Sequence, residues 1–328
     1  MTLSAFLAFL ARRLFKAFAV VLGVIIVTFF IVRLAPGDPA SVIAGQSGAA
    51  DAQFMAQLRE QFGLDRPLLV QLGIYLRGIL SFDFGYSHRV QRSVLSLVGE
   101  RLPATILLTG TAFVFSLAAG ISLGALAARK VGTTTDSVVT VLALTFYATP
   151  IFWVGLIFIL VFSVWLNWLP ALGMFSISAG YTGLRAVLDV VTHLILPALT
   201  LGFFYMALYA RLTRSSMLEV ASQDFVRTAR AKGMREGPIL RRHILRNSIL
   251  PVIGFAGVQA GQLVGGSILV ETVFSWPGIG RLAFESLLAR DYNLLLGVFI
   301  VTSAMAVIIN LITDIVSALI DPRIEVDG

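Results

Sequence analysis

The sequence contains no cysteine among its 328 residues. Disulfide bonds, thiolate nucleophiles and thiolate metal sites are therefore excluded, and the redox compartment cannot be read from cysteine usage. The three histidines, His88, His193 and His243, lie far apart, and the sequence has no HExxH-like spacing. We therefore expect no metal site in this chain.

Charge is also scarce. Only 13% of the residues are charged and 57% are hydrophobic, whereas soluble domains carry roughly 25% charged residues. Apolar runs near twenty residues, long enough to cross a hydrocarbon layer of about 30 Å, recur along the whole chain. A lipid-exposed backbone must satisfy its own hydrogen bonds, and the alternation typical of barrel strands is missing, so the pattern predicts an all-α membrane protein. Its six predicted transmembrane helices are Ala17–Val32, Thr105–Ala128, Val138–Trp165, Leu194–Ala210, Ile249–Val270 and Leu294–Ile320.

The distribution of Lys and Arg predicts the orientation of these spans. The first run follows Arg12, Arg13 and Lys16 but lacks an A-x-A cleavage site, so we expect an anchor rather than a signal peptide. Cations gather before the first span, between the second and third spans, and above all between the fourth and fifth spans. In the short connections on the opposite side, acids match or exceed the cations. Both termini are therefore predicted to be cytoplasmic.

The connection between the first two spans is long and nearly charge-balanced, which indicates an external surface. Within it, the "DRP" at Asp65–Pro67 predicts a short helix with Pro67 at its first position. We divide the chain into an anchor span with this extracytoplasmic connection, a five-span core containing the cytoplasmic connection, and a cytoplasmic tail. The first region covers residues 1–104, the second covers residues 105–320 with the cytoplasmic connection at 211–248, and the tail covers residues 321–328.

Residues 224–233, "DFVRTARAKG", form a polar stretch between the fourth and fifth spans. Ser222 and Asp224 favour a helix start, Phe225 and Ala229 share one face, and Gly233 supplies a left-handed stop. The stretch therefore predicts one short helix.

A second, amphipathic piece follows Gly237 and Pro238 and carries Arg241, Arg242 and Arg246 on its polar face. Such a basic connection is either a solvated loop that retains the protein and touches anionic lipid, or a docking element. A capped helix with small residues favours docking, because small side chains let a partner approach closely.

The "DFVRTARAKG" stretch and the following "RHILRNSILP" resemble the cytoplasmic signature of permease subunits of ATP-binding cassette (ABC) importers. The similarity is to the dipeptide, oligopeptide and nickel permease family and covers nearly the whole chain. Further matches are "RLAPGDPA", "FGLDRPLLVQ", "FGYSHR", "ERLPATILL", "ETVFSWPGIGRL" and "DPRI". The resemblance implies a type I ABC importer permease fold in the bacterial inner membrane, and a transport subunit rather than an enzyme.

In this family the short helix sits in a cleft of a cytoplasmic ATPase and transmits its closure to the spans. The superfamily motif is Glu-Ala-Ala, three residues, Gly, nine residues and Ile-x-Leu-Pro. Here only Ala229 and Gly233 match outright, and Leu250 with Pro251 arrive five residues late, which looks like the peptide-permease variant. The residues that the resemblance assigns to ATPase coupling are Asp224, Arg227, Thr228, Ala229, Ala231 and Gly233.

None of Lys16, Lys130 and Lys232 lies in a G-x-x-x-x-G-K-[ST] phosphate loop, so ATP must be hydrolysed elsewhere. The resemblance implies a second homologous permease, two ATPases that bind ATP and Mg, and an extracytoplasmic solute-binding protein. We expect no cofactor in this chain itself. The net charge is +7, and the cations gather in the connections on one side of the membrane. We therefore expect membrane lipid as a partner and do not expect nucleic acid. The substrate stays open among dipeptides, longer peptides, glutathione and nickel.

Polar and small residues within the spans are candidates for packing and transport. Three glycines at four-residue spacing in the fifth span predict a helix-packing ridge. They are Gly257, Gly261 and Gly265. Gln259 and Gln262 lie off this ridge and, with Asn310, are candidates either for lining the translocation route or for interhelical hydrogen bonds. Pro150 and Pro197 mark either a kink or a proline tolerated by packing.

Two other classes of protein agree less well with the sequence than a permease does. "GISLG" matches the G-x-S-x-G pattern, but the helical rise places Ser122 roughly 25 Å from the outer end of its span. His193 begins the fourth span at that outer end, which argues against a serine protease. An ion-coupled transporter requires a charge at mid-depth, and the sequence offers only Asp314 near the cytoplasmic end.

Overall fold

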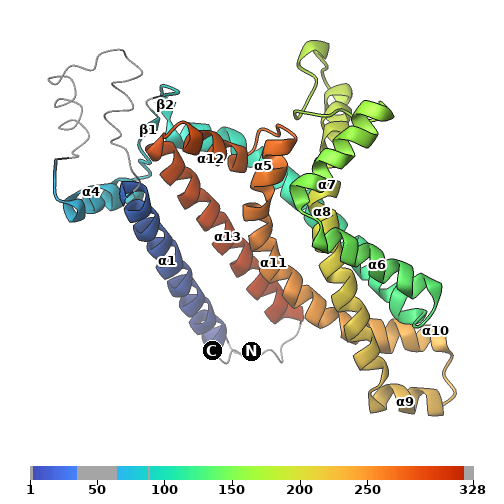
Figure 1. Ribbon diagram of the computed structural model, residues 1–328. Coiled ribbons are helices and arrows are strands. Elements are labelled where there is room, and N and C mark those ends of the chain that lie inside the picture. The colour runs from blue at the N-terminus through green and yellow to red at the C-terminus, as the bar shows by residue number, and fades with distance from the viewer. Residues whose placement is uncertain (1–2, 35–64, 88, 321–328) are drawn as a thin grey trace. The chain divides into compact units, whose positions relative to one another are not determined.

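The computed structural model describes residues 3–34, 65–87 and 89–320, which are mostly helical (Figure 1). The long helices are α1 (Leu3–Leu34), α5 (Val94–Arg129), α8 (Leu184–Ala221), α11 (Arg246–Val273) and α13 (Tyr292–Ile320). The shorter helices are α4 (Leu68–Leu80), α6 (Thr134–Ala148), α7 (Ile151–Phe158), α9 (Asp224–Ala231), α10 (Glu236–Pro238) and α12 (Ile279–Leu288). Strands β1 (Tyr86–Ser87) and β2 (Arg92–Ser93) form an antiparallel hairpin that the sequence did not predict. Two π stretches lie at Ile159–Trp165 and Ile239–Leu245, and a 3₁₀ turn lies at Ile177–Ala179.

Five helical segments in the described part of the chain are long and apolar enough to cross a membrane alone. They lie in α1, α5, α8, the run from α10 into α11, and α13. A sixth candidate consists of α6 and α7 with the following π turns, bent by 106° at the break between them. The predicted all-α membrane fold is confirmed, with five candidate spans or six if the bent pair is counted as the third, and the cytoplasmic location of both termini stays a prediction.

The bend falls at Thr149 and Pro150, one of the two prolines identified from sequence. Both residues have extended backbone, with ψ of 133° and 130°. Proline disfavours helical geometry in the residue before it and has no N–H to continue the helical ladder. Pro197, by contrast, lies inside α8, which continues through it. Neighbouring helices make such an interior proline tolerable in a span.

The long helices all exceed the spans predicted for them, and α5 and α8 are the longest. α5 has 36 residues and α8 has 38, and 38 residues of helix measure about 57 Å. Since the hydrocarbon layer is about 30 Å thick, both helices extend beyond it. The helix predicted after "DRP" is confirmed as α4, with Pro67 in the position before its first residue. Residues 35–64 of the outer connection and the predicted tail 321–328 lie outside the described residues.

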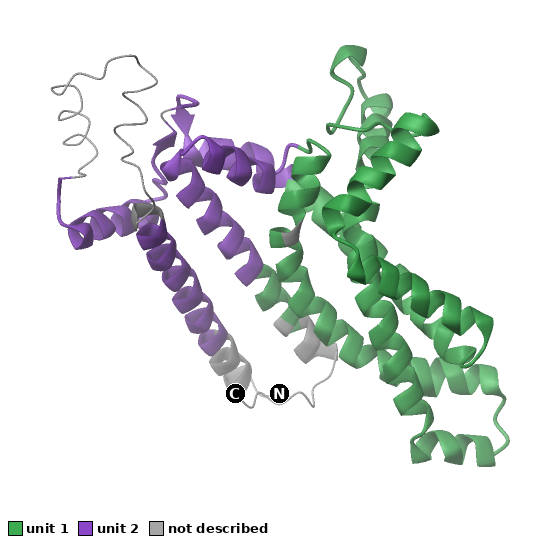
Figure 2. Cartoon of the chain, in the orientation of Figure 1, with its two compact units in different colours: residues 1, 105–276, 308–328 green, residues 2–104, 277–307 purple. Residues whose placement is uncertain are grey.

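The chain forms two compact units, coloured separately in Figure 2. The first comprises Thr105–Trp276 with Ile308–Gly328, and the second comprises Thr2–Ala104 with Pro277–Val307. Residues 277–307 fall in the second unit. The predicted division of the chain into three regions stays a prediction.

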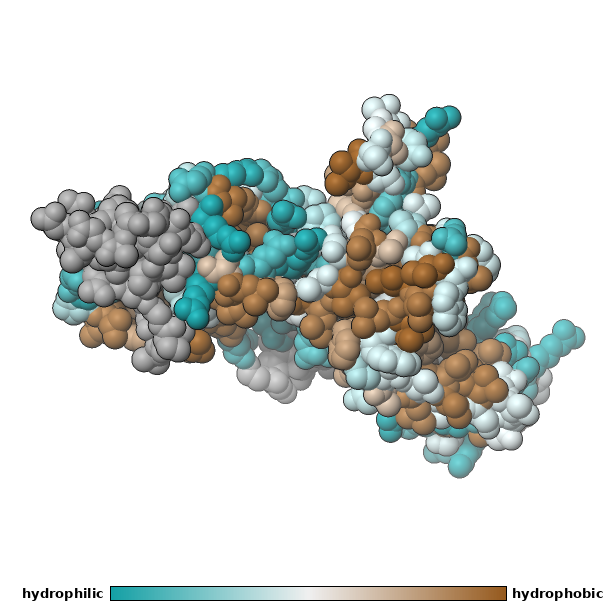
Figure 3. Space-filling model, turned by 45° about the horizontal axis from the view of Figure 1, so that its top comes forward, coloured by the Kyte–Doolittle hydropathy of each residue, from teal (hydrophilic) through white to brown (hydrophobic). Residues whose placement is uncertain are grey.

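In the first unit α8 is the central helix and packs against α6, α7 and α11. The ring of Phe203 on α8 stacks on Phe146 of α6 at 4.5 Å and meets Phe115 of α5 and Phe158 of α7 edge-on. Aromatic pairs of this kind are worth roughly 0.5–1.5 kcal/mol each beyond their buried area. Apolar residues cover much of the visible surface over these helices, on the right of Figure 3, as expected for a surface that faces lipid or another apolar chain.

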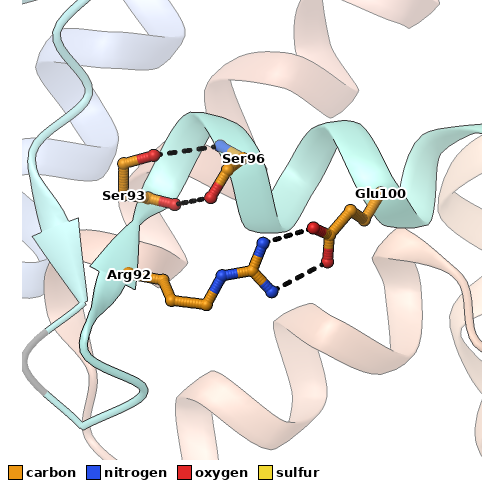
Figure 4. A network of polar contacts seen from close by, with 4 residues as sticks. All are labelled: Arg92, Ser93, Ser96 and Glu100. Atoms are coloured by element: carbon orange, nitrogen blue, oxygen red, sulfur yellow. Dashed lines mark hydrogen bonds and ion pairs between the residues drawn. The ribbon is translucent and has the colours of Figure 1, made fainter.

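In the second unit the first turns of α5 pack against α12 and the beginning of α13 through Val94, Ile279 and Leu295. The β hairpin is joined to α5 by Arg92, which donates two hydrogen bonds to the Glu100 carboxylate (Figure 4). The start of α5 is closed by Ser93, whose hydroxyl accepts the Ser96 N–H at 3.3 Å (Figure 4). A side-chain acceptor at this position satisfies a backbone donor that the helix leaves open.

Candidate coupling site

The long helix α8 ends beside the short helix that the sequence predicted. The hydroxyl of Ser222 donates to the Glu219 carbonyl at 2.7 Å, so Ser222 closes α8 and does not cap the next helix, contrary to expectation. Gln223 takes the N-cap position of α9 in an extended conformation. Asp224 follows in the first turn, where its charge interacts favourably with the positive end of the helix dipole. The predicted short helix at this point is confirmed as α9.

One side of α9 is buried within its own unit. Val226 is 0% and Ala229 is 5% exposed, and they pack in a cluster with Met217 and Val220 of α8. Ile239 and Ile244, which precede α11, complete this cluster. Phe225 is 40% exposed and contacts the His243 ring instead. Phe225 lies one helical turn before Ala229, as expected, but the residue that is buried together with Ala229 is Val226.

The opposite side of α9 is exposed. Five of the six residues assigned to coupling are exposed: Asp224, Arg227, Thr228, Ala231 and Gly233. Ala229 faces the cluster, so in this structure it supports the helix from within and offers no outer contact. The exposed groups are ordered locally, because the Thr228 hydroxyl donates to the Asp224 carbonyl at 2.9 Å and Arg227 pairs with Asp224 at 3.5 Å.

Gly233 ends α9 through its backbone conformation. Its φ is +74°, the left-handed region that side chains with a Cβ disfavour. The Gly233 N–H donates to the Arg230 carbonyl at 2.9 Å and the Met234 N–H donates to the Ala229 carbonyl at 3.3 Å. These two bonds form a Schellman motif, which satisfies carbonyls at the end of the helix. The left-handed stop predicted at Gly233 is confirmed.

An ion pair spans the turn that follows. Arg230 donates from Nε and Nη2 to the two oxygens of Glu236, at 2.9 and 3.4 Å. The hydrogen bond to Glu236 raises the pKa of Arg230. Both side chains are largely exposed, so the pair orders the turn but contributes little to stability.

The second amphipathic piece is confirmed as α10 and the π turns that run directly into α11. Ile239 and Ile244 are buried, whereas Arg241, Arg242 and Arg246 are exposed. The helical run begins at Glu236, so Gly237 and Pro238 lie in its first turn rather than before it. Proline fits there because the first turn has no intrahelical acceptor for its missing N–H.

The predicted glycine ridge meets α13 at two of its three positions. A Cβ on Gly257 would lie within 3 Å of the Thr313 side chain, and one on Gly261 would lie 2.8 Å from Asn310 Oδ1. Among the described residues, no atom lies within 4 Å of a Cβ placed on Gly265. Two glycines therefore permit the close approach of α11 and α13, and the third is exposed.

The three pathway candidates lie in different surroundings. Gln259 is buried at 9% exposure, while Gln262 and Asn310 are exposed. Asn310 packs against Gly261, so the structure brings it to the ridge and not to the two glutamines. The role of all three in lining a route stays a prediction.

Glu271 is a buried carboxylate that the sequence analysis placed just outside the fifth span. α11 continues to Val273, and the Glu271 side chain is 0% exposed. Its Oε1 accepts hydrogen bonds from Thr105 at 2.7 Å and from Ser267 at 3.1 Å. The sequence signal for this site is an acid directly after an apolar run. Such an acid can be buried in the continuing helix when hydroxyl donors lie opposite it.

Ser122 and His193 each have local partners. The Ser122 hydroxyl donates to the Ala118 carbonyl at 2.7 Å, and His193 Nδ1 lies 2.8 Å from the Asp189 carbonyl oxygen. Gly120 and Gly124, which flank Ser122, would place a Cβ 2.6 Å from Tyr209 Cβ and 2.4 Å from the Ala210 oxygen. The "GISLG" segment is thus a contact between α5 and α8.

Comparison with known proteins gives the family. The model described as "binding-protein-dependent transport system inner membrane component" matches residues 120–326, and the model of its N-terminal region matches residues 6–109. The dipeptide transport system permease protein DppB of Alkalihalophilus pseudofirmus is 39% identical, covering 97% of this chain and 99% of the relative. DppB of Escherichia coli K12 is 38% identical, with the same coverage. The probable peptide ABC transporter permease y4tP of Sinorhizobium fredii is 40% identical, again over 97% and 99%.

A solved structure supports the fold. The methionine ABC transporter MetNI in an inward-facing conformation matches with a TM-score of 0.56 and 16% identity, over 69% of this chain and 96% of that one. Family membership excludes the ion-coupled and protease alternatives, and members of the family work with an ATPase and a substrate-binding partner. The chain belongs to the inner-membrane components of binding-protein-dependent transport systems, and is a multi-pass permease subunit of a bacterial ABC importer.

Proposed function

We propose that this chain forms half of the translocation pathway of a peptide importer and docks onto its ATPase through α9. Relatives named as dipeptide or peptide permeases over their full length support the substrate class. The partners in this proposal are a second homologous permease, two ATPase subunits that hold ATP and Mg, and an extracytoplasmic solute-binding protein. No cofactor is assigned to this chain.

The two faces of α9 carry the docking proposal. Val226 and Ala229 fix the helix to its own unit, while the residues around Arg227 and Thr228 are exposed. A short helix held from one side and polar on the other suits insertion into a groove of a partner. α9 and α8 both contribute residues to the buried cluster, and the π turns that run into α11 complete it. A displacement of α9 would therefore be transmitted to α8 and α11.

Gly233 offers a test with a matched control. Asn tolerates the left-handed conformation better than other non-glycine residues, and Asp has the same shape with a negative charge. We expect Gly233→Asn to keep import within about twofold, whereas Gly233→Asp lowers import about tenfold, equivalent to 1.4 kcal/mol. The reason is that Asp must lose its water when the surface docks. Both variants should enter the membrane normally.

The measurement is dipeptide uptake together with ATP hydrolysis by the complete transporter in proteoliposomes. Uncoupled or unassembled ATPase in the Asp variant alone supports docking at this surface. Normal uptake and normal ATPase assembly in Gly233→Asp contradict it. Dipeptide uptake by the unaltered transporter tests the substrate class separately.

A further inference from the structure

An ion pair joins α6 to α8 a short distance before α9. Arg214 Nε donates to Asp136 Oδ1 at 2.7 Å, and Arg214 Nη2 donates to Oδ2 at 2.8 Å. The Gly132 N–H also donates to Oδ2, at 3.1 Å. The Asp136 side chain is only 9% exposed, so the pair is shielded from water on the carboxylate side. Paired bonds between a planar guanidinium and a carboxylate fix an angle as well as a distance.

The position of the pair connects it to the cluster beneath α9. Arg214 lies on α8 one turn before Met217, which packs in that cluster with Val226 and Ala229. From the α5 side, Ala125 and Ala128 pack against the same cluster. The chain then turns at Lys130–Thr133 and enters α6, whose first turn carries Asp136.

Below this pair the contact between α5 and α8 is also close. Gly124 on α5 lies against Ala210 and Thr213 of α8, with Thr213 directly preceding Arg214. The end of α5, the turn, and the start of α6 are therefore attached to α8 at successive points. α6 runs beside α8 in Figure 1 and contacts it from Asp136 near the start of α6 to Tyr147 near its end.

We propose that Asp136 and Arg214 are positioning residues that make the start of α6 move together with α8 when α9 is displaced. This inference rests on the proposed docking of α9. The two hydrogen bonds of this ion pair fix the register of the start of α6 against α8 at one point, close to α9. A displacement of α9 passes to α8 through the cluster and to α6 through the ion pair, so the bent third span follows the ATPase.

The structure also predicts that folding survives loss of the pair. Farther along α6, Phe146 stacks on Phe203 at 4.5 Å and Tyr147 stacks on Phe204 at 5.5 Å. These contacts hold α6 on α8 about three helical turns from Arg214. A buried ion pair is in any case weak evidence for stability, because desolvation offsets much of its attraction.

Charge exchange tests the proposal in the complete transporter in proteoliposomes, with the number of dipeptides imported per ATP hydrolysed as the readout. We expect Asp136→Arg and Arg214→Asp each to lower this ratio about tenfold, within the range of coupling between paired residues. The double variant Asp136→Arg/Arg214→Asp should recover at least about half of the ratio, because an opposite-charge pair is restored. A purely structural contribution would change transporter yield without changing this ratio.

Two further variants keep the test informative if the exchanged chains accumulate poorly. Arg214→Lys keeps the charge but loses the two-bond geometry, so its ratio should fall about threefold. Arg211→Asp lies on the same helix at an exposed position and changes the net charge by the same amount as Arg214→Asp. It should leave the ratio within about twofold. A normal ratio in Arg214→Lys and Arg214→Asp, or no recovery in an assembled double variant, overturns the proposal.

Failure of the ion-pair proposal is distinguishable from failure of α9 docking. Gly233→Asp in the same assay reports on docking, since it leaves Asp136 and Arg214 unaltered. Loss of coupling in Gly233→Asp with a normal ratio in the Arg214 variants rejects only the ion pair. Normal coupling in Gly233→Asp rejects the docking on which the proposal rests.

Discussion

Replacing Gly124 with alanine is expected to destabilise the protein by about 1–3 kcal/mol, the usual cost of forcing an extra methyl group into a packed contact. The new Cβ would lie 2.4 Å from the Ala210 carbonyl oxygen and 2.7 Å from Thr213 Cβ. The first of these neighbours is backbone, so it cannot swing aside as a long side chain can. α5 and α8 would have to separate by about 1 Å to reach normal contact distance.

Gly110 on the same helix provides the matched control. Among the described residues, no atom beyond the surrounding backbone of its own helix lies within 4 Å of a Cβ at Gly110. Its replacement by alanine should be neutral or stabilising, because alanine favours a helix by about 1 kcal/mol over glycine. The comparison is made by heating the detergent-solubilised transporter and measuring the fraction that stays monodisperse on size exclusion. Equal midpoints for the two variants would show that the contact between α5 and α8 is not close-packed at Gly124.

The second large effect is expected at Glu271. Glu271→Leu removes the acceptor of the Thr105 hydroxyl, whereas the Ser267 hydroxyl keeps its bond to the Val264 carbonyl at 2.8 Å. We expect a loss of about 3 kcal/mol, at the upper end of the cost for removing a buried partner. Glu271→Gln keeps an oxygen at the same place and should lose about 1 kcal/mol. The same thermal assay measures both variants.

Gln262 on α11 is the control for this experiment. Its side chain is exposed, so Gln262→Leu should change the stability of the protein by no more than about 0.5 kcal/mol. If Glu271→Gln is as unstable as Glu271→Leu, hydrogen-bond acceptance alone does not explain the buried carboxylate and its charge is required. If Glu271→Leu is as stable as the unaltered protein, the two hydroxyl contacts contribute nothing net.

Features that depend on neighbouring residues along the chain could be predicted well. Apolar runs gave the spans because the length of a span follows from the thickness of the membrane. The short helix α9 and its glycine stop could be predicted because a left-handed terminus depends on local backbone preference. The face of α9 was harder, since Phe225 and Val226 are both apolar and only packing selects which one is buried.

Lengths and bends were predicted less completely. α8 begins ten residues before the expected start of its span, because a helix can continue into water where hydropathy no longer marks it. The sequence marked Pro150 and Pro197 in the same way, yet the helix breaks at Pro150 and continues through Pro197. What separates the two is the backbone conformation of the preceding residue, and tertiary packing decides it.

The sequence by itself determined the membrane class, the family and the location of the short helix α9, because each depends on hydropathy, local backbone preference or contiguous motifs. Only the tertiary structure decided which polar groups meet. Asp136 and Arg214 are 78 positions apart, and Thr105 and Glu271 are 166 apart. No local pattern encodes such pairings, because they arise when apolar helix faces pack and the few polar groups between them must find partners.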